Sequence, residues 1–328
     1  MSGQPIDPEI LKRLDPEYVE FHNKYIAHLP APHTLPWDAT IRNKEAVPGA
    51  ADILQVGSVK DYDLSKTKVR VFTPKGSPPE GGWPVYCWYH GGGWTLGSIS
   101  AENAFCSRIC QGAKCVVATV DYRLAPEYPY PAAVEDSLET LQWIYEKGPS
   151  LLGINTASIA LGGSSAGGNL AAIISMKATQ LNPPIPVVHV QMIVPVTDNT
   201  AQPTGNPYPS WKECANTVWL DVGRMIWFRD FYVPNEADRT KWDCSPIFAP
   251  DDLLAKMPST WVAVMELDIL RDEGLAYAER LKKVGVPVTH KLYKKAPHQI
   301  LAMDGVLAVG RELVADATRN LGEVFGTL

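Results

Sequence analysis

A turn of small residues, GSSAGG at positions 163–168, stands between two apolar segments of different kinds. Residues 158–161 predict a strand that leads into the turn, and residues 169–174 predict a helix that leads out of it. A strand that becomes a helix so abruptly holds its central side chain, Ser165, above the sheet in a strained backbone conformation. Side chains at Gly163 and Gly167 would collide, so both must be glycine. The Gly-x-Ser-x-Gly pattern is typical of a nucleophilic serine, and a small-residue turn without chemistry is the alternative.

The chain has 328 residues, enough for two domains or for one large α/β domain with insertions. Apolar residues make up 45% of it, which supports a sizeable core and argues against disorder. The net charge of −6 is mild and argues against nucleic acid or an anionic membrane as a partner. The sequence has no run of 18 apolar residues, so we expect no membrane span. The polar N-terminus has no apolar h-region and predicts no secretory signal.

Six cysteines are present, and their spacing does not match a zinc site. Cys106 and Cys110 lie four apart on one expected helical face, but no histidine or second cysteine pair completes a ligand set. We therefore expect buried, reduced thiols in a cytoplasmic protein, with no metal and no cofactor.

Residues 1–45 predict an amphipathic helical arm, because apolar side chains recur at helical spacing between Ile10 and Tyr25. This arm either covers a pocket as part of a cap or packs on the main body without a function. From residue 53 the apolar pattern changes to a period of two. Residues 53–56 and 69–72 predict paired antiparallel strands, and residues 84–89 predict a buried strand.

Strands and helices then alternate, which predicts a mostly parallel sheet with helices on both faces. The expected helices are at about 101–112, 132–147, 168–181, 273–284 and 301–322, and the expected strands are at 115–120, 158–162, 187–194, 261–265 and 288–293. The body thus comprises residues 46–196 and 256–328. Residues 197–255 interrupt it and predict an inserted, mostly helical cap. Its large rings line an apolar substrate pocket or form the cap's own core, which is the commoner role for any single ring.

Three consecutive glycines follow the expected strand 84–89, in the sequence His90-Gly91-Gly92-Gly93-Trp94. Such a run allows close backbone approach and free N–H groups. It matches the glycine-rich loops that hold an oxyanion in acyl-transfer enzymes, with a further amide supplied by the residue after the nucleophile. An ordinary flexible loop is the alternative.

A serine hydroxyl needs a base, most often a histidine that a carboxylate orients. Three histidines follow Ser165 in the chain. His189 and His290 lie inside expected strands, where packing or an edge position explains them. His298 lies on a loop after the last expected strand and is the candidate base.

The candidate acid lies in the loop after the expected strand 261–265. Asp268 is just past the strand end and is preferred, with Asp272 and Glu266 as the next candidates. Asp272 and Glu273 begin the next expected helix, where acidic side chains suit capping and the helix dipole.

These motifs together resemble the hormone-sensitive-lipase-like family of α/β-hydrolases, over residues 68–320. The matching blocks are residues 90–94, 121–127 with Asp136, 163–169 and 268–274. The resemblance implies an α/β-hydrolase fold with a helical cap, made by the N-terminal arm and residues 197–255. It implies that Gly92, Gly93 and Ala166 supply the oxyanion amides while Gly91 shapes the loop.

Three positions depart from that family's usual pattern. Ser164 stands where many members carry Asp or Thr, Ile269 replaces a common proline, and Gln299-Ile300 follows His298 in place of Gly-Phe. The last change alters the shape expected for the nearby pocket.

The resulting hypothesis is a serine carboxylester hydrolase for small-molecule esters of short to medium chain length. Amide, formamide or lactone hydrolysis, or acyl transfer, would use the same triad. A small-molecule receptor on this fold, like the plant gibberellin receptors, is the non-enzyme alternative, and His298 argues against it. Substrate contacts are expected from Trp94, Asn169, Trp211 and Trp219. The oligomeric state stays open, a homodimer included.

Overall fold

The computed structural model describes residues 3–43 and 48–328. Residues 1–2 and 44–45 of the expected arm lie outside the described residues. No helix within the described ranges is long and apolar enough to cross a membrane.

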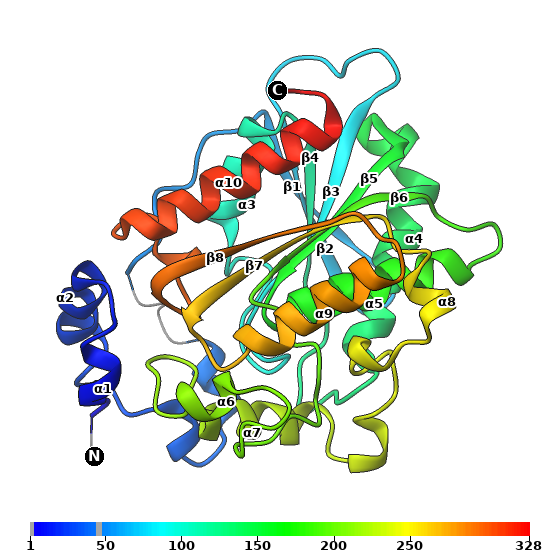
Figure 1. Cartoon of the computed structure of the whole chain (residues 1–328). Helices are drawn as coiled ribbons and strands as arrows, with labels where there is room; N and C mark the ends of the chain where they lie inside the picture. Colours follow the sequence, from blue (N-terminus) through cyan, green and yellow to red (C-terminus); the bar gives the residue numbers. More distant parts are fainter. Residues whose placement is uncertain (1–2, 44–47) are drawn as a thin grey trace.

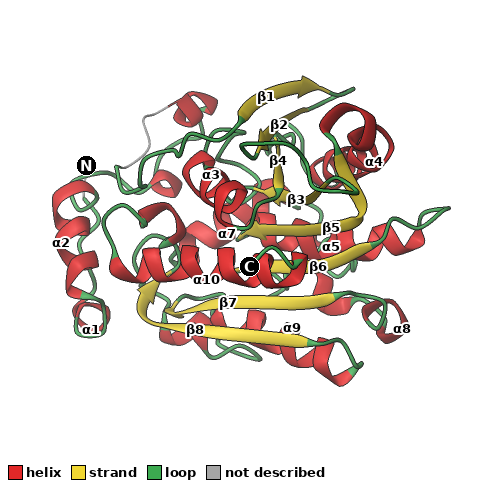
Figure 2. Cartoon of the chain, turned by 90° about the horizontal axis from the view of Figure 1, so that it is seen from above, coloured by secondary structure: helices red, strands yellow, loops and turns green. Residues whose placement is uncertain are grey.

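One eight-stranded sheet forms the centre of the molecule, in the order β1-β2-β4-β3-β5-β6-β7-β8 (Figures 1 and 2). β2 is antiparallel to β1 and β4, and every other neighbouring pair is parallel. This confirms the α/β prediction. The strands are β1 (Ser58–Asp63), β2 (Lys68–Thr73), β3 (Trp83–Tyr89), β4 (Val116–Val120), β5 (Ile154–Ser164), β6 (Val187–Ile193), β7 (Ser259–Leu267) and β8 (Val288–Pro297).

Helices cover both faces of the sheet (Figure 2). On one face lie α3 (Asn103–Gly112) and α10 (Ala308–Phe325), which contact each other. On the other lie α4 (Ala132–Leu152), α5 (Ala166–Gln180) and α9 (Arg271–Lys283). Each face has its own buried apolar cluster, because central parallel strands are apolar on both sides. The sheet is therefore a rigid platform for the loops at its carboxyl ends.

The first strand was expected at the wrong place. Residues 53–56 form no strand, and Ile53 is 58% exposed. The strand that pairs with the outer side of β2 is β1, whose residues are mostly exposed and polar. A charged edge strand needs no apolar period, so the alternation that signals an internal strand is missing from it.

The described part of the N-terminal arm contains two α-helices, α1 (Pro8–Leu11) and α2 (Pro16–Tyr25), followed by two short 3₁₀ helices at Pro32–Thr34 and Ala39–Asn43. α1 and α2 separate at Asp15-Pro16, where Asp15 caps α2 and proline occupies its first turn. Tyr18 and Phe21 are buried in the same apolar cluster as α3 and α10.

Residues 197–255 carry α6 (Ser210–Glu213), α7 (Val222–Tyr232) and α8 (Asp251–Leu254), joined by loops and two short 3₁₀ turns. α6 and α7 lie below the sheet in Figure 1, at the ends toward which the parallel strands run. Trp37 of the arm packs against Trp227 and Phe231 of α7, with ring centroids 5.8 and 5.2 Å apart. The arm and the inserted segment therefore meet on that side.

Candidate active site

Ser165 lies on the turn between β5 and α5. Its φ is +55° and its ψ is −115°, a conformation that residues with a side chain rarely adopt. A Cβ atom on Gly163 would overlap the backbone of Gly167, and one on Gly167 would overlap the carbonyl oxygen of Tyr89. The structure thus confirms that both positions require glycine.

Three side chains from the ends of different strands meet at this turn. Nε2 of His298 lies 2.9 Å from Oγ of Ser165, and Nδ1 lies 2.7 Å from Oδ2 of Asp268. His298 follows β8 directly, and Asp268 follows β7. The side chains of His298 and Asp268 are only 4% and 1% exposed, so their hydrogen bonds are screened little by water. This is the arrangement of a nucleophile, a base and an orienting acid.

The other two histidines that follow Ser165 in the chain, His189 and His290, have no hydrogen bond to it among the described residues. His189 lies between Ser259 and Asn320, each 2.8 Å from one of its ring nitrogens. Burial lowers the pKa of His189 to about 4, which keeps the ring neutral. His290 is exposed on the edge strand β8.

The other candidate acids also have partners away from Ser165. Asp272 pairs with Arg271 and accepts the Ser210 N–H. Glu266 accepts the Lys295 N–H at 2.8 Å. Neither carboxylate has a hydrogen bond to His298 among the contacts of the described residues.

Glu273 is a further buried carboxyl next to the acid loop. It accepts the Thr197 N–H at 2.7 Å and the indole N–H of Trp211 at 2.9 Å. Burial raises its pKa to about 8. Glu273 therefore fastens the inserted segment to α9.

The glycine-rich loop after β3 follows an unusual backbone path. Gly92, Gly93 and Trp94 have φ values of +118°, +60° and +55°. The N–H groups of Gly92 and Gly93 donate to no protein acceptor within the described ranges. Ala166 is the first residue of α5, and the first amides of a helix have no acceptor within it. These three amides are the ones that the family resemblance predicts as donors to an oxyanion.

Gly91 differs from its neighbours, because its N–H donates to Oε1 of Glu102 at 3.3 Å. The same carboxyl accepts the Ser164 hydroxyl at 2.8 Å and the indole N–H of Trp88. Sequence reasoning missed Glu102. The available signal was a glutamate immediately before α3, at a cap position that usually holds a shorter polar residue.

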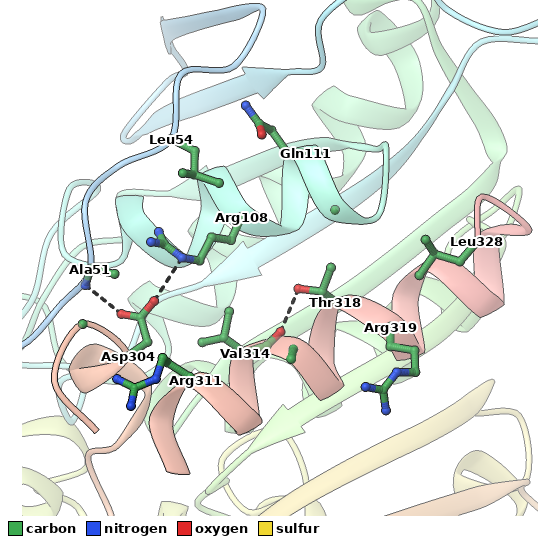
Figure 3. A pocket seen from close by; sticks show the side chains of 13 residues that line it. Ala51, Leu54, Arg108, Gln111, Asp304, Arg311, Val314, Thr318, Arg319 and Leu328 are labelled. Carbon is green, nitrogen blue, oxygen red and sulfur yellow. Dashed lines mark hydrogen bonds and ion pairs between the residues drawn. The ribbon is translucent and has the colours of Figure 1, made fainter. Parts of the chain in front are cut away.

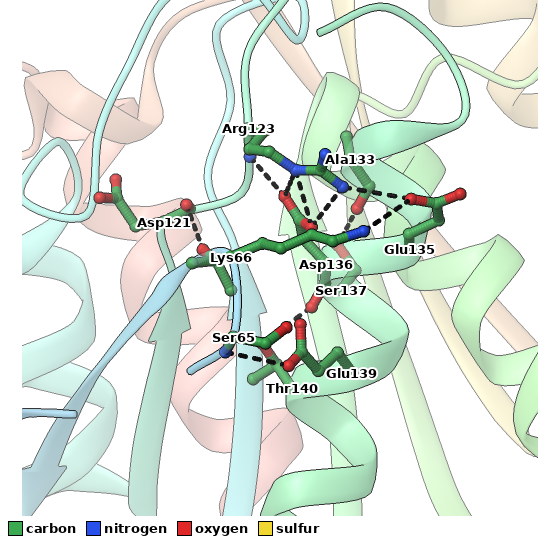
Figure 4. Close-up of polar contacts among 11 residues, drawn as sticks. Ser65, Lys66, Asp121, Arg123, Ala133, Glu135, Asp136, Ser137, Glu139 and Thr140 are labelled. Atoms are coloured by element: carbon green, nitrogen blue, oxygen red, sulfur yellow. Dashed lines mark hydrogen bonds and ion pairs between the residues drawn. The ribbon is translucent and has the colours of Figure 1, made fainter. Parts of the chain in front are cut away.

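Tyr122 supports the start of the same loop. Its hydroxyl donates to the His90 carbonyl at 2.7 Å, and its ring stacks on the His90 ring at 4.2 Å. The next residue, Arg123, forms a two-pronged ion pair with Asp136 of α4 (Figure 4). Residues 121–127 therefore make two structural contacts: Tyr122 supports the glycine-rich loop, and Arg123 pairs with Asp136.

Three of the four residues expected to contact the substrate are buried and interact with other protein groups. Trp94 stacks on Tyr232 at 4.0 Å, and Trp211 is bonded to Glu273. The Asn169 amide donates to the carbonyls of Val196 and Cys244 at 3.0 Å each. Trp219 is half-buried. Substrate contact stays a prediction for all four.

The six cysteines are all buried and none is in a disulfide, as expected. Burial raises the pKa of the Cys110 thiol to about 12 and that of Cys214 to about 11. These thiols are inert toward nucleophilic chemistry at neutral pH.

A separate groove of about 840 Å³ lies between α3 and α10 (Figure 3). Arg108 crosses it to Asp304 at 3.2 Å, and Leu54 and Val314 contribute apolar surface. No triad residue lines this groove.

A model of the family described as having the alpha/beta hydrolase fold matches residues 86–302, from β3 through the residues that follow His298. The chain belongs to this family of α/β hydrolases. The match confirms the resemblance to hormone-sensitive-lipase-like esterases that the motifs indicate.

The similarity to named relatives covers most of the length of the hydrolase. It is 44% identical to an AB hydrolase superfamily protein of Schizosaccharomyces pombe, covering 98% of this chain and 97% of the relative. It is 36% identical to a carboxylesterase of Mycobacterium tuberculosis, covering 69% of each chain.

A solved structure agrees with these relatives. An α/β hydrolase enzyme from the metagenome of Lake Arreo, Spain, superposes with a TM-score of 0.85 at 30% identity. The superposition covers 96% of the hydrolase and all of the other chain.

Proposed function

We propose that this esterase cleaves short- to medium-chain carboxylic esters through an acyl-enzyme on Ser165. The observation that carries the proposal is the unbroken contact chain from Ser165 Oγ through the His298 ring to Asp268, at 2.9 and 2.7 Å. A serine in this setting is activated by its neighbours, because the imidazole takes its proton as the hydroxyl attacks.

The first half of the reaction forms the acyl-enzyme. Ser165 Oγ attacks the ester carbonyl carbon while His298 Nε2 takes the hydroxyl proton. Asp268 holds the Nδ1–H tautomer and stabilises the imidazolium. His298 then gives its proton to the leaving alcohol as the carbon–oxygen bond breaks. In the second half a water gives a proton to His298, attacks the acyl carbon and releases the acid, and the proton returns to Ser165.

The carbonyl oxygen gains charge in both halves. We propose that the amides of Gly92, Gly93 and Ala166 hold it, with each such donor worth about 3 kcal/mol of transition-state stabilisation. The free N–H groups and positive φ angles of the two glycines support this role.

We further propose a division of the chain into a catalytic body, residues 46–196 and 256–328, and a cap made by residues 1–45 and 197–255. A Cβ atom on Gly93 would overlap the Phe228 ring of α7, which supports a cap that covers the oxyanion loop. Such an aromatic cover favours short and medium acyl groups over long ones. The six buried thiols support a cytoplasmic location.

A chain-length series tests the substrate class. p-Nitrophenyl esters from acetate to palmitate, with p-nitroanilides of the same acids, are compared by kcat/KM. The proposal expects a maximum at or below the medium chain lengths and much slower anilide cleavage. Faster anilide or lactone hydrolysis would instead support the amidase or lactonase alternative. Small-molecule binding without hydrolysis of any of these substrates would support the receptor alternative.

A further inference from the structure

The carboxyl group of Glu102 accepts hydrogen bonds from both the nucleophile turn and the glycine-rich loop. Its Oε1 atom accepts the Ser164 hydroxyl at 2.8 Å and the Gly91 N–H at 3.3 Å. Ser164 immediately precedes the nucleophile, and Gly91 immediately precedes the two glycines with free amides. One oxygen atom therefore links the nucleophile turn to the oxyanion loop.

The two segments are in close contact at this point. A Cβ atom on Gly91 would lie 2.6 Å from Ser164 Oγ and 3.5 Å from Glu102 Oε1. A residue larger than glycine at position 91 would therefore require the Ser164 side chain to move. A displacement of the Glu102 carboxyl would therefore change how the loop lies against the turn.

Glu102 is itself held by a regular element. It occupies the N-cap position of α3, yet its side chain makes no capping bond to that helix, although its backbone carbonyl accepts the Cys106 N–H. Its second oxygen, Oε2, accepts the indole N–H of Trp88 in β3. Burial raises the pKa of this carboxyl, while its three hydrogen bonds oppose that change. The side chain is thus directed away from its own helix and toward the site.

We propose that Glu102 is a positioning residue, which sets the placement of the oxyanion amides relative to Ser165 during acyl transfer. The inference rests on the proposed esterase function. Because the oxyanion exists only after Ser165 attacks, misplaced amides weaken the transition state more than the bound substrate. Loss of Glu102 should therefore lower kcat and leave KM nearly unchanged.

The test variant is Glu102→Asp, which keeps a carboxyl group and withdraws it by one methylene. Its kcat is expected to fall by about 10²-fold, as for a displacement of about 1 Å. Its KM should stay within about threefold of the wild-type value. A trifluoromethyl ketone forms a tetrahedral oxyanion adduct on the serine, so its inhibition constant should rise by about the same factor as kcat falls.

Glu102→Gln serves as the conservative rescue. Its amide oxygen can still accept from Gly91 and Ser164. Only the contact with Trp88 is lost, because the side-chain NH₂ group then faces the indole N–H, and both groups are donors. It should retain kcat within about tenfold of the wild type. Trp88→Phe removes the donor to Oε2 alone and should change thermal stability more than kcat.

Asp136→Asn supplies a comparison for stability. It weakens a buried ion pair with Arg123 that has no contact with the oxyanion loop. If Glu102→Asp keeps wild-type kcat and ketone affinity, the positioning role is refuted. The role is also refuted if Asp136→Asn, compared at the same folded fraction, lowers kcat and ketone affinity as much as Glu102→Asp does. Failure of the proposed function would differ, because the wild-type protein itself would then neither hydrolyse esters nor bind the ketone.

Discussion

Nδ1 of His298 lies 2.7 Å from Oδ2 of Asp268, although 30 residues separate them in the chain. The reason is topological, since β7 and β8 are adjacent parallel strands and each residue follows the carboxyl end of its strand. The pair faces the nucleophile turn after β5, and this places a base, an acid and a serine at one edge of the sheet.

Asp268→Asn should lower kcat by about 10⁴-fold, because the amide no longer fixes the His298 tautomer that accepts a proton from serine. Asp272→Asn is the matched control: its carboxylate lies four residues further on, in the first turn of α9, where it pairs with Arg271 and accepts the Ser210 N–H. It should stay within about tenfold of the wild type. Ester hydrolysis under saturating substrate measures both. A near-normal Asp268→Asn with an inactive Asp272→Asn would assign the acid to Asp272.

Gly167→Ala should destabilise the fold by more than about 3 kcal/mol, because its Cβ would overlap the Tyr89 carbonyl oxygen, which is part of the backbone. Gly76→Ala is the control. Gly76 has a φ of +93° but open space around it, so only a conformational cost of about 1 kcal/mol applies. Urea unfolding gives both values. Equal losses for the two variants would show that close approach at the turn is unimportant.

Arg123→Met should cost about 3–5 kcal/mol of stability, because it leaves the 1%-exposed Asp136 carboxylate without its cation. The kcat of the folded fraction should be unchanged. Lys12→Met removes a salt bridge to Glu9 in which both side chains are mostly exposed. That change should cost less than about 1 kcal/mol. Thermal unfolding of the two variants provides the comparison, and a loss near zero for Arg123→Met would contradict the structural role of the 121–127 block.

Glu273 should make stability fall as the pH rises. Its pKa in the folded protein, about 8, lies above the ordinary value of 4.5, so between these values the native state holds a proton that the unfolded chain releases. Its stabilising contribution is complete below pH 4.5 and is lost as the pH rises through 8. Glu273→Gln cannot titrate, so its Tm minus the wild-type Tm should become more positive from pH 5 to pH 8. A difference that is constant or falls with pH would contradict a raised pKa.

The three residues of the proposed triad leave clearer patterns in the sequence than the edge of the sheet does. Ser165, Asp268 and His298 were found because glycines at a turn and polar residues after apolar strands leave a local pattern. The order of the strands, which neighbouring residues do not encode, then brings the three together. The edge strand β1 was misplaced because its mostly polar residues give no such pattern.

Glu102 was missed for a related reason. Its partners Gly91 and Ser164 lie 11 and 62 residues away, and a single carboxylate before a helix has no spacing that distinguishes it from a surface residue. The break in the N-terminal arm has a sequence signal, because an aspartate followed by a proline, as in Asp15-Pro16, commonly begins a new helix.

The most direct test of the central claim is mass spectrometry of the protein after reaction with a fluorophosphonate, beside p-nitrophenyl acetate turnover. An activated serine should give one covalent adduct per chain, on the peptide that contains Ser165, with complete loss of turnover. Ser165→Ala should form no adduct and lose several orders of magnitude in kcat while keeping the wild-type Tm. An adduct on another residue, or substantial turnover by Ser165→Ala, would contradict an acyl-enzyme at Ser165.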